Sequence, residues 1–341
     1  PGRATGGNRL GLNAVMGVKM LCISEKEILE VVNLKDIMTA VKNAMLLYER
    51  KEFKMPKRMH ADYRGNTLLL MPCFTKEKFA TKLVSLFPGN AEQDLPVLMG
   101  TVILNDGQTG RPLALMNGAK LTALRTGAVG GMAVYSLTPP GIKTVGIVGA
   151  GVQGFHQALF ACRVRGISRV FVYDALPQRV DHVMQELADF LMGVKIYRAF
   201  SVEDLVRESE LIITATNAEQ PVLPDDTELL RGKHFIGIGS YKPEMREFPA
   251  ALFKLVDEMY VDTFHAKEES GDLIDPLRNG WIEERQVRTL GQLMLSQEKQ
   301  APVPGRTTLF KSVGMALFDL LVADMVYRGA VKKGVGTQVE L

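Results

Sequence analysis

The sequence contains few cysteines, and its histidines are scattered. Among 341 residues there are three cysteines, Cys22, Cys73 and Cys162, which lie far apart and form no CxxC pair. This spacing argues against a disulfide framework and against a cysteine zinc site, and it favours a reducing cytoplasm. The five histidines share no ligand spacing, so we expect no metal site.

The sequence also lacks a strong net charge and a long apolar run. The 41 basic and 38 acidic residues give a formal net charge of +3, and the basic residues are dispersed along the chain. Such a balance does not indicate a nucleic-acid groove. No run approaches the roughly 20 apolar residues of a transmembrane helix, and we expect no signal peptide. We therefore predict neither nucleic acid nor a membrane as a partner.

What is present is the composition of a globular protein, with 46% hydrophobic and 23% charged residues. At roughly 150 residues per domain, the length predicts two domains. Residues 1–18 are rich in Gly, Asn and Arg and show no periodicity. They are predicted to be a tail or a cloning remnant without function.

Two regions with different patterns follow. Residues 19–119 carry a helical pattern interrupted near Asn33 and extended runs around the turns at 64–66 and 107–110, which predicts an α+β, sheet-forming region. After a Gly- and Ala-rich helical stretch, strands and helices alternate up to about residue 305. This alternation is typical of an α/β fold with a doubly wound parallel sheet. The apolar stretch 307–327 predicts an amphipathic helix.

The most specific motif is a glycine-rich turn. The segment 149–154, GAGVQG, matches GxGxxG, directly follows an apolar strand and opens a helix. The first glycine allows the tight turn, the second lets a pyrophosphate approach the backbone, and the third lets the helix pack on the strand. The alternative is a flavodoxin-like turn without a ligand. We predict dinucleotide binding through Gly149, Gly151, Val152, Gln153 and Gly154.

An acidic residue accompanies this turn. The next strand ends at Asp174, whose carboxylate can accept hydrogen bonds from ribose hydroxyls and would repel a 2′-phosphate. We therefore expect NAD(H) to be preferred over NADP(H), although the nearby Arg179 softens this preference. Further cofactor contacts are expected at the end of the later apolar run LIITAT, from Thr214, Ala215 and Thr216. The alternative is that these residues form an ordinary polar loop.

Three cations outside the alternating region need an explanation. Arg58 begins a predicted strand, Lys82 interrupts the apolar run FATKLVSLF, and Arg125 lies on the Gly- and Ala-rich helix. Because burying an unpaired cation is costly, Lys82 and Arg125 should face a carboxylate of the protein or a bound anion. From the residues alone, a surface or salt-bridged role is the alternative for all three.

Seven segments together resemble one family. They are MPKR with Arg58, ATKLVS with Lys82, LTALRTGAV with Arg125, VGIVGAGVQG, YVD with Asp262, ESGD with Asp272, and TLFKSVGMAL. In order and spacing, from about residue 20 to 328, the chain resembles the ornithine cyclodeaminase/μ-crystallin family. The resemblance implies a homodimer whose Rossmann domain, 120–305, is inserted into an α+β substrate-binding and dimerisation domain made of 19–119 and 306–330. Residues 331–341 are then a C-terminal tail.

The resemblance also implies roles for individual residues. Arg58, Lys82 and Arg125 are expected to bind the substrate's α-carboxylate, with Lys82 close to the reacting imine carbon. Two arginines can hold a carboxylate bidentately, and a lysine can donate a proton as imine and amine interconvert. The segment 311–314 is implied to lie near the nicotinamide. We assign Lys311 and Ser312 to the cofactor. We assign Val313 and Gly314 to the substrate.

Two positions depart from the family pattern. Members that cyclise ornithine carry one acidic residue where this chain has Tyr241 and a second where it has Leu69. Without them a distal ammonium loses two ionic partners, and each charged hydrogen bond is worth about 1.5–3 kcal/mol. We predict a site for an uncharged side chain or a cyclic imine, with Leu69 lining it and Tyr241 as a proton donor. The alternative is that Tyr241 only packs under the cofactor.

These observations predict an NAD(H)-dependent oxidoreductase that interconverts a small α-imino acid, linear or cyclic, and an α-amino acid. One alternative is an ornithine cyclodeaminase-type ammonia-lyase, which converts L-ornithine to L-proline with bound NAD. Another is a nucleotide-bound storage protein without turnover.

Overall fold

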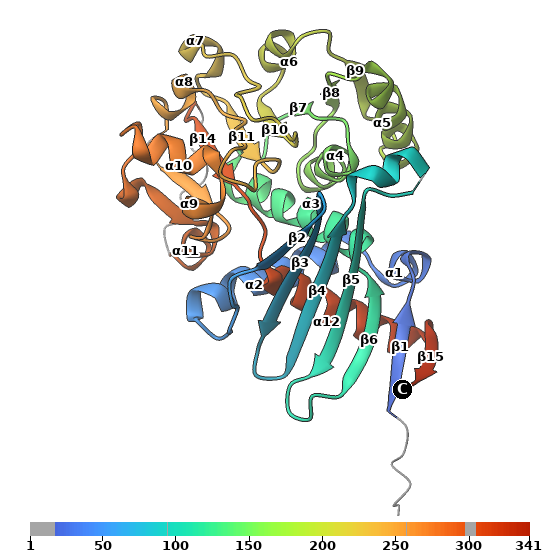
Figure 1. The fold of residues 1–341 in the computed structure, drawn as a ribbon. Coiled ribbons are helices and arrows are strands. Elements are labelled where there is room, and N and C mark those ends of the chain that lie inside the picture. The colour runs from blue at the N-terminus through green and yellow to red at the C-terminus, as the bar shows by residue number, and fades with distance from the viewer. Residues whose placement is uncertain (1–17, 94, 257, 297–304) are drawn as a thin grey trace, which may run out of the picture.

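The protein contains two β-sheets with helices packed between and around them (Figure 1). The structure, a computed structural model, describes residues 18–93, 95–256, 258–296 and 305–341. The predicted tail over residues 1–18 therefore lies, except for its last residue, outside the described residues.

The first sheet has seven strands in the order β15-β1-β6-β5-β4-β3-β2. Strands β2 to β6 form an antiparallel meander, β1 lies parallel to β6, and β15 lies antiparallel to β1. The predicted hairpin turn is confirmed, since Arg64 and Gly65 both take positive φ, as a two-residue hairpin turn requires. The strands are β1 (Lys19–Ile23), β2 (Met59–Tyr63), β3 (Asn66–Phe74), β4 (Lys78–Leu86), β5 (Leu98–Asp106), β6 (Pro112–Asn117) and β15 (Thr337–Glu340).

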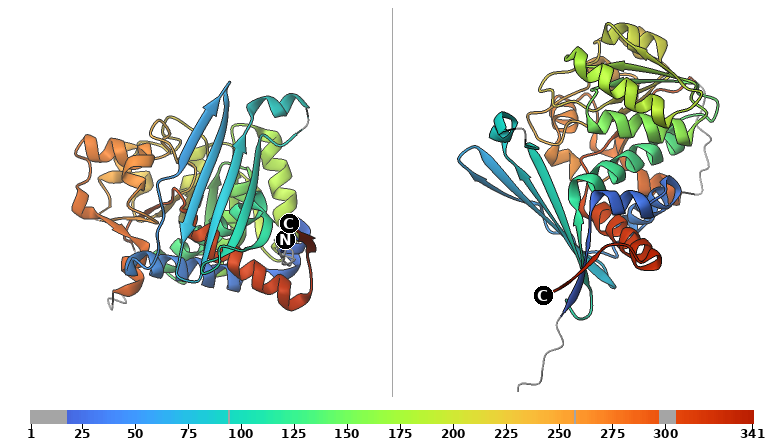
Figure 2. Two further views of the ribbon diagram at one scale, coloured as in Figure 1. Left: turned by 60° about the horizontal axis from the view of Figure 1, so that its bottom comes forward. Right: turned by 90° about the vertical axis from the view of Figure 1, so that its right-hand side faces the viewer.

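One face of this sheet is covered by helices and the other is bare (Figure 2). The covering helices are α1 (Glu25–Val31), α2 (Leu34–Arg50), α3 (Gly118–Leu137) and α12 (Ala316–Lys333). Ser24 caps α1 in a capping box with Glu27, and Asn33 caps α2, which explains the predicted interruption of the helical pattern. On α3, a Cβ at Gly130 would clash with Gln157 of α4, so the small residues of α3 allow the two helices to approach closely.

The second sheet is parallel throughout, in the order β13-β12-β14-β11-β10-β7-β8-β9. The predicted doubly wound α/β fold is confirmed. The strand order reverses between β7 and β10, and ligands bind at the carboxyl ends of strands at such a point. The strands are β7 (Thr144–Val148), β8 (Arg169–Tyr173), β9 (Lys195–Arg198), β10 (Leu211–Thr214), β11 (His234–Gly237), β12 (Met259–Val261), β13 (Val287–Thr289) and β14 (Thr308–Lys311).

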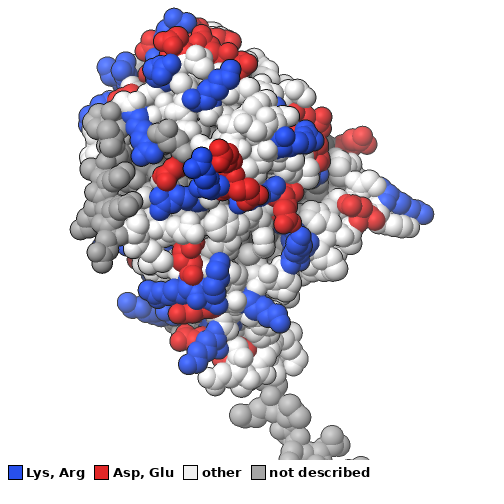
Figure 3. All heavy atoms as spheres, turned by 90° about the vertical axis from the view of Figure 1, so that its left-hand side faces the viewer, with Lys and Arg blue, Asp and Glu red and all other residues white. Residues whose placement is uncertain are grey.

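Helices and short turns connect these strands, and charged side chains of both signs are interspersed over the face seen in Figure 3. None of the described helices is long and apolar enough to span a membrane. The connecting elements are α4 (Val152–Val164), α5 (Pro177–Phe190), α6 (Val202–Glu208), α7 (Thr227–Leu230), α8 (Ala250–Phe253), α9 (Ala266–Glu269), α10 (Gly271–Arg278) and α11 (Leu290–Leu295). Two 3₁₀ turns complete the list, η1 (Pro88–Gln93) and η2 (Glu284–Gln286).

The C-terminal region differs from the sequence prediction in two ways. Residues 308–311 are not helical but form β14, which pairs with β11 and β12 inside the second sheet, and the helix begins only at Ala316. A short apolar run is consistent with either element, so periodicity could not separate them. Residues 331–341 are not a tail, because α12 continues to Lys333 and β15 pairs with β1. The segment 306–330 therefore gives a strand to the second sheet and a helix that packs on the first, and the proposed domain boundaries stay a prediction.

Candidate active site

The turn between β7 and α4 has the shape that a bound phosphate needs. Gly149 takes φ +105°, and a Cβ there would lie 2.5 Å from the carbonyl oxygen of Ala215. A Cβ on Gly154 would clash with the Gly149 carbonyl, whereas a Cβ on Gly151 would meet no atom within 4 Å. Packing thus requires the first and third glycines, and the second faces open space that a pyrophosphate can fill.

The N-terminus of α4 completes this cradle. Gly151 is its N-cap residue and offers no side-chain hydrogen bond, so the first amides of the 13-residue helix are available to an anion. The carboxylate of Asp174 lies at the same turn, where it accepts 2.8 Å hydrogen bonds from the amides of Ala150 and Leu176. An uncapped helix end, an open glycine and an acidic residue at the end of β8 together fit a dinucleotide.

Three other predicted cofactor residues lie around this turn. Val152 is exposed on the first turn of α4, and among the described atoms the buried Oε1 of Gln153 has no hydrogen-bond partner. Arg179 is exposed near the start of α5, which follows β8. The structure thus places all three near the turn, and their contacts with a cofactor stay a prediction.

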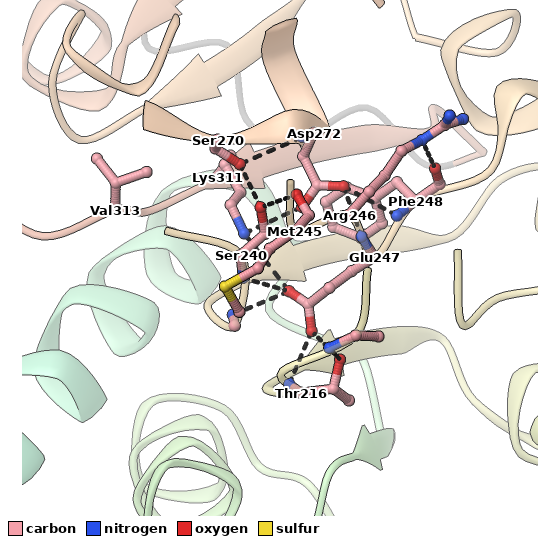
Figure 4. A network of polar contacts seen from close by, with 12 residues as sticks. Thr216, Ser240, Met245, Arg246, Glu247, Phe248, Ser270, Asp272, Lys311 and Val313 are labelled. Carbon is pink, nitrogen blue, oxygen red and sulfur yellow. Dashed lines mark hydrogen bonds and ion pairs between the residues drawn. The ribbon is translucent and has the colours of Figure 1, made fainter. Parts of the chain in front are cut away.

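The loop after β10 is held by a buried glutamate (Figure 4). Glu247 accepts hydrogen bonds from the amide and hydroxyl of Thr216 at 2.8 and 2.9 Å, and from the amide of Gly239 at 2.8 Å. Ala215 lies against Gly149, as predicted for a residue of the cofactor site. Thr214 is fully buried within β10. Glu247 therefore fixes two loops at the carboxyl edge of the sheet.

The side chain of Lys311 belongs to this buried network. Its ammonium lies 3.4 Å from Glu247 and 3.1 Å from Asp272, and the side chains of all three are fully buried. Asp272 in turn accepts hydrogen bonds from the amides of Glu247 and Phe248. Two carboxylates of the protein therefore bind the Lys311 ammonium, and the predicted place of Lys311 beside the cofactor stays a prediction.

Ser312 is also committed to a carboxylate of the protein. Asp262 is fully buried after β12, and accepts hydrogen bonds from the Ser312 hydroxyl at 2.6 Å and from the Gly314 amide at 2.8 Å. Burial raises the pKa of Asp262, while these hydrogen bonds oppose the shift. The predicted cofactor role of Ser312 stays a prediction. Asp262 instead fixes the backbone of the segment after β14.

The structure brings Lys82 and Arg125 together on one buried carboxylate. Asp319, on α12, lies 2.9 Å from the Lys82 ammonium through Oδ2 and 3.1 Å from the Arg125 Nε through Oδ1. The prediction that these two cations face a carboxylate of the protein or an anion is confirmed. Burial lowers the pKa of Lys82 to about 8, helped by Arg125 and Arg58 and opposed by Asp319.

Arg58 and Arg125 meet at Gly314. An Arg58 terminal nitrogen donates to the carbonyl of Gly314 at 3.0 Å and pairs with Glu269 at 2.8 Å. Gly314 takes φ +74°, and a Cβ there would lie 2.8 Å from a terminal nitrogen of Arg125. Val313, whose carbonyl lies 3.4 Å from Arg58, belongs to the same turn. The two arginines thus approach the predicted substrate segment from different elements.

The two positions that depart from the family pattern lie in different parts of the site. Leu69 pairs with Val84 on β4, and Met71 pairs with Lys82, so Leu69 faces the same side of the sheet as Lys82. Tyr241 lies in the loop after β11 and is 38% exposed. Among the described residues, no hydrogen bond or ion pair joins Tyr241 to Lys82, and its role as a donor stays a prediction.

Sequence reasoning missed three carboxylates of the site. Asp319 pairs with two cations, Glu269 with Arg58, and Glu247 with Lys311. Asp319 had a signal, since it interrupts the apolar stretch ALFDLLVA in the way that Lys82 interrupts its strand. Glu269 opens the segment ESGD, of which only Asp272 was singled out, and Glu247 stands in a polar loop, where an acidic residue is unremarkable in sequence.

Comparison with known proteins agrees with this geometry. The sequence profile of the ornithine cyclodeaminase/mu-crystallin family matches residues 18–334. The chain is 32% identical over 329 residues to a Delta(1)-pyrroline-2-carboxylate reductase of Bacillus cereus, covering 94% of this chain and 100% of the relative.

Solved structures are similar over the same length. A Delta(1)-pyrroline-2-carboxylate reductase of Thermococcus litoralis in complex with NADH and L-proline is 33% identical with a TM-score of 0.87, covering 94% of this chain and 100% of that one. An archaeal alanine dehydrogenase dimer with bound NAD is 27% identical with a TM-score of 0.86, covering 95% and 99% of the two chains.

Proposed function

The chain belongs to the ornithine cyclodeaminase/mu-crystallin family, and from this premise we propose that it is an NAD(H)-dependent reductase of small α-imino acids. It interconverts an imino acid, linear or cyclic, and the corresponding α-amino acid. The observation that carries the proposal is that Arg58 and Arg125 meet at Gly314, while Lys82 shares the carboxylate of Asp319 with Arg125. Gly314 follows β14, at the same edge of the parallel sheet as the glycine-rich turn after β7.

The charges of the site suit a monocarboxylate. Glu269 pairs with Arg58, and Asp319 is shared by Lys82 and Arg125, so the direct ion pairs join three cations to two carboxylates. By this count of direct pairs, one positive charge is left for the substrate. A substrate carboxylate can accept paired hydrogen bonds from the two guanidinium groups, which orients its α-carbon.

Lys82 is the proton donor in this proposal. When bound, NADH supplies the hydride for the imine carbon, and this chemistry belongs to the cofactor. The Lys82 ammonium donates a proton to the neutral imine nitrogen, which becomes the amine. A pKa of about 8 suits an acid that works near neutral pH.

The cavity beside Arg58 and Gly314 has a mixed lining. Its apolar residues are Met55, Pro56, Met71, Met315 and Ala316, and its polar ones include His265 and Glu269. The Glu269 carboxylate is already paired with Arg58, and Leu69 and Tyr241 stand where the family resemblance implies acidic residues in members that cyclise ornithine. We therefore propose a substrate with an uncharged side chain or a cyclic imine.

Two further features belong to this proposal. Asp174 at the end of β8 supports a preference for NAD(H) over NADP(H), because its charge would repel a 2′-phosphate.

The bare face of the first sheet supports a homodimer, because strand alternation directs several exposed apolar side chains to it. These are Met59, Tyr63, Leu68 and Met99.

The test is a screen of NADH oxidation by the purified protein. It compares cyclic imine carboxylates, pyruvate with ammonia or methylamine, and L-ornithine with NAD. We expect NADH consumption with one or more imino acids and none of the ornithine chemistry. Formation of proline and ammonia from ornithine, without a net change in NADH, would instead identify a cyclodeaminase.

A further inference from the structure

Asp319 is a buried carboxylate on α12, outside the set of groups expected to touch the substrate. Its neighbours in the helix, Phe318 and Leu320, are buried apolar residues, so α12 turns an apolar face toward the first sheet at this point. A carboxylate in such a place is costly unless it is paired. Its two oxygens divide between two cations, Oδ1 to Arg125 and Oδ2 to Lys82.

Lys82 depends on this carboxylate for its charge. Among the described residues Asp319 is the one acidic partner of its ammonium, and the remaining hydrogen bond, to the Thr122 hydroxyl, is 3.5 Å long. Arg125 from α3 and Arg58 from the segment before β2 both act against the charge. The Cys73 thiol on β3, whose pKa burial raises to about 12, stays neutral. Removing Asp319 would leave a buried ammonium that faces only cations.

Arg125 depends on Asp319 for its orientation. Its Nε donates to Asp319, and its two terminal nitrogens lie against Gly314, 2.8 and 3.2 Å from the position of a Cβ there. A guanidinium is planar, so fixing Nε on one side fixes the direction of the other two nitrogens. The carboxylate of Asp262, which holds the Gly314 amide, also acts on Arg125.

We propose that Asp319 is the positioning residue of this site, which keeps Lys82 charged as a proton donor and turns Arg125 toward the substrate carboxylate. The inference rests on the proposed function. In the reaction the imine carbon gains a hydride from NADH, the imine nitrogen gains the Lys82 proton, and the neutral Lys82 amine regains its proton from solvent. Asp319 stays ionised throughout, because Arg125 and Lys82 together hold its pKa below the ordinary value against the effect of burial.

The first test measures the charge of Lys82 without turnover. In the full protein labelled with ¹³C,¹⁵N-lysine, the side-chain signal of Lys82 is assigned by its loss in Lys82→Met. We expect this signal to titrate near pH 8 in the wild type and at least one pH unit lower in Asp319→Asn. The same titration in both proteins would overturn the proposal.

The second test measures the pH profile of kcat/KM for imine reduction. In the wild type kcat/KM should fall above about pH 8, as Lys82 loses its proton. In Asp319→Asn the fall should begin at least one pH unit lower, and KM for the imino acid should rise more than tenfold because Arg125 is released. Asp324→Asn is the matched control, since Asp324 lies on the same helix but pairs with the exposed Arg328. An unshifted profile in Asp319→Asn would contradict the proposal.

A second variant covers the case in which Asp319→Asn does not fold, as judged by NADH binding. Asp319→Glu keeps the charge and moves the carboxylate. It should leave the Lys82 titration within half a pH unit of the wild type while raising KM for the imino acid, and an unchanged KM would contradict the positioning of Arg125. If the wild type reduces no imino acid, the proposed function fails, and the lysine titration still decides the inference separately.

Discussion

At the scale of single residues, Lys82 and its two arginines explain how the site would treat a carboxylate. Lys82 is 3% exposed, and its ammonium forms an ion pair with the buried carboxylate of Asp319. Arg58 and Arg125 reach the same turn from parts of the chain 67 residues apart. A site built in this way has its hydrogen-bond donors fixed before the substrate arrives.

The first prediction concerns Lys82 itself. Lys82→Met removes the proton donor but keeps a side chain of similar length, so turnover of the imino acid should fall by about 10²–10⁴-fold. Affinity for NADH should change less than about threefold, because the glycine-rich turn lies on another part of the molecule. Steady-state kinetics and fluorescence titration with NADH measure the two quantities. Turnover close to that of the wild type would remove Lys82 from the mechanism.

The second prediction concerns Gly314. An alanine there is strained by φ +74° and also meets Arg125, so KM for the imino acid should rise by at least tenfold. Gly110→Ala is the matched control, because Gly110 has the same φ of +74° with no atom within 4 Å of a Cβ. Both variants should lose about 1–2 kcal/mol of stability from backbone strain. Equal KM values in the two variants would show that Arg125 does not need the space at Gly314.

The residues of this site were predicted from the sequence to different degrees. The glycines and the three cations stand in recognisable patterns, and the structure places them where the patterns indicate. Lys311 and Ser312 stand in an equally recognisable segment, but their side chains turn to Glu247, Asp272 and Asp262. Sequence spacing gives the position of the segment but not the direction of each side chain.

At the scale of elements, the three glycines of the turn between β7 and α4 serve two functions, packing of the fold and space for a ligand. Gly149 and Gly154 are in contact with neighbouring backbone, whereas Gly151 faces open space. A change at the first or third glycine therefore acts on the fold, and a change at the second acts on the ligand.

The third prediction separates the effect of these glycines on stability from their effect on NADH binding. Gly151→Ala should keep the melting temperature within about 2 °C of the wild type while weakening NADH binding by at least tenfold, because the new methyl group fills the space of the pyrophosphate. Gly154→Ala should lower the melting temperature by several degrees, because its methyl group clashes with the Gly149 carbonyl. Thermal unfolding and NADH titration of both variants check this. Unchanged NADH binding in Gly151→Ala would contradict the assignment of the turn.

The elements of the chain were also unequally predictable. Strands bounded by turn residues, such as β2 and β3 around Gly65, were predicted from sequence, because turn chemistry is local. Strands β14 and β15 were not, since β14 enters the middle of a sheet begun about 160 residues earlier, and β15 pairs with β1 at the other end of the chain. No local pattern specifies such pairings.

At the scale of the whole molecule, the chain places a parallel sheet, which carries the glycine-rich turn, beside a mostly antiparallel sheet that carries Lys82. Helices α3 and α12 connect them, and these two helices carry Arg125 and Asp319 (Figure 1). In the proposed reaction the parallel sheet carries the glycine-rich turn for the cofactor, and the first sheet and these two helices carry the side chains for the substrate carboxylate.

The fourth prediction concerns assembly. If the bare face of the first sheet forms a homodimer, Met99→Glu should shift the protein toward the monomer in light scattering, because it places a charge among apolar side chains. Met192→Glu is the control, since Met192 is 93% exposed beyond the end of α5, away from this sheet. A wild-type protein that is monomeric at all concentrations would contradict the dimer.

The most direct measurement compares two cyclic imines that differ only in the carboxylate, Δ¹-pyrroline-2-carboxylate and Δ¹-pyrroline, as substrates for NADH oxidation. Two arginines that hold the carboxylate by charged hydrogen bonds, each worth about 1.5–3 kcal/mol, predict a kcat/KM about 10²–10⁴-fold higher for the carboxylate. Equal kcat/KM for the two imines would contradict the account of an imine reductase that recognises the substrate carboxylate.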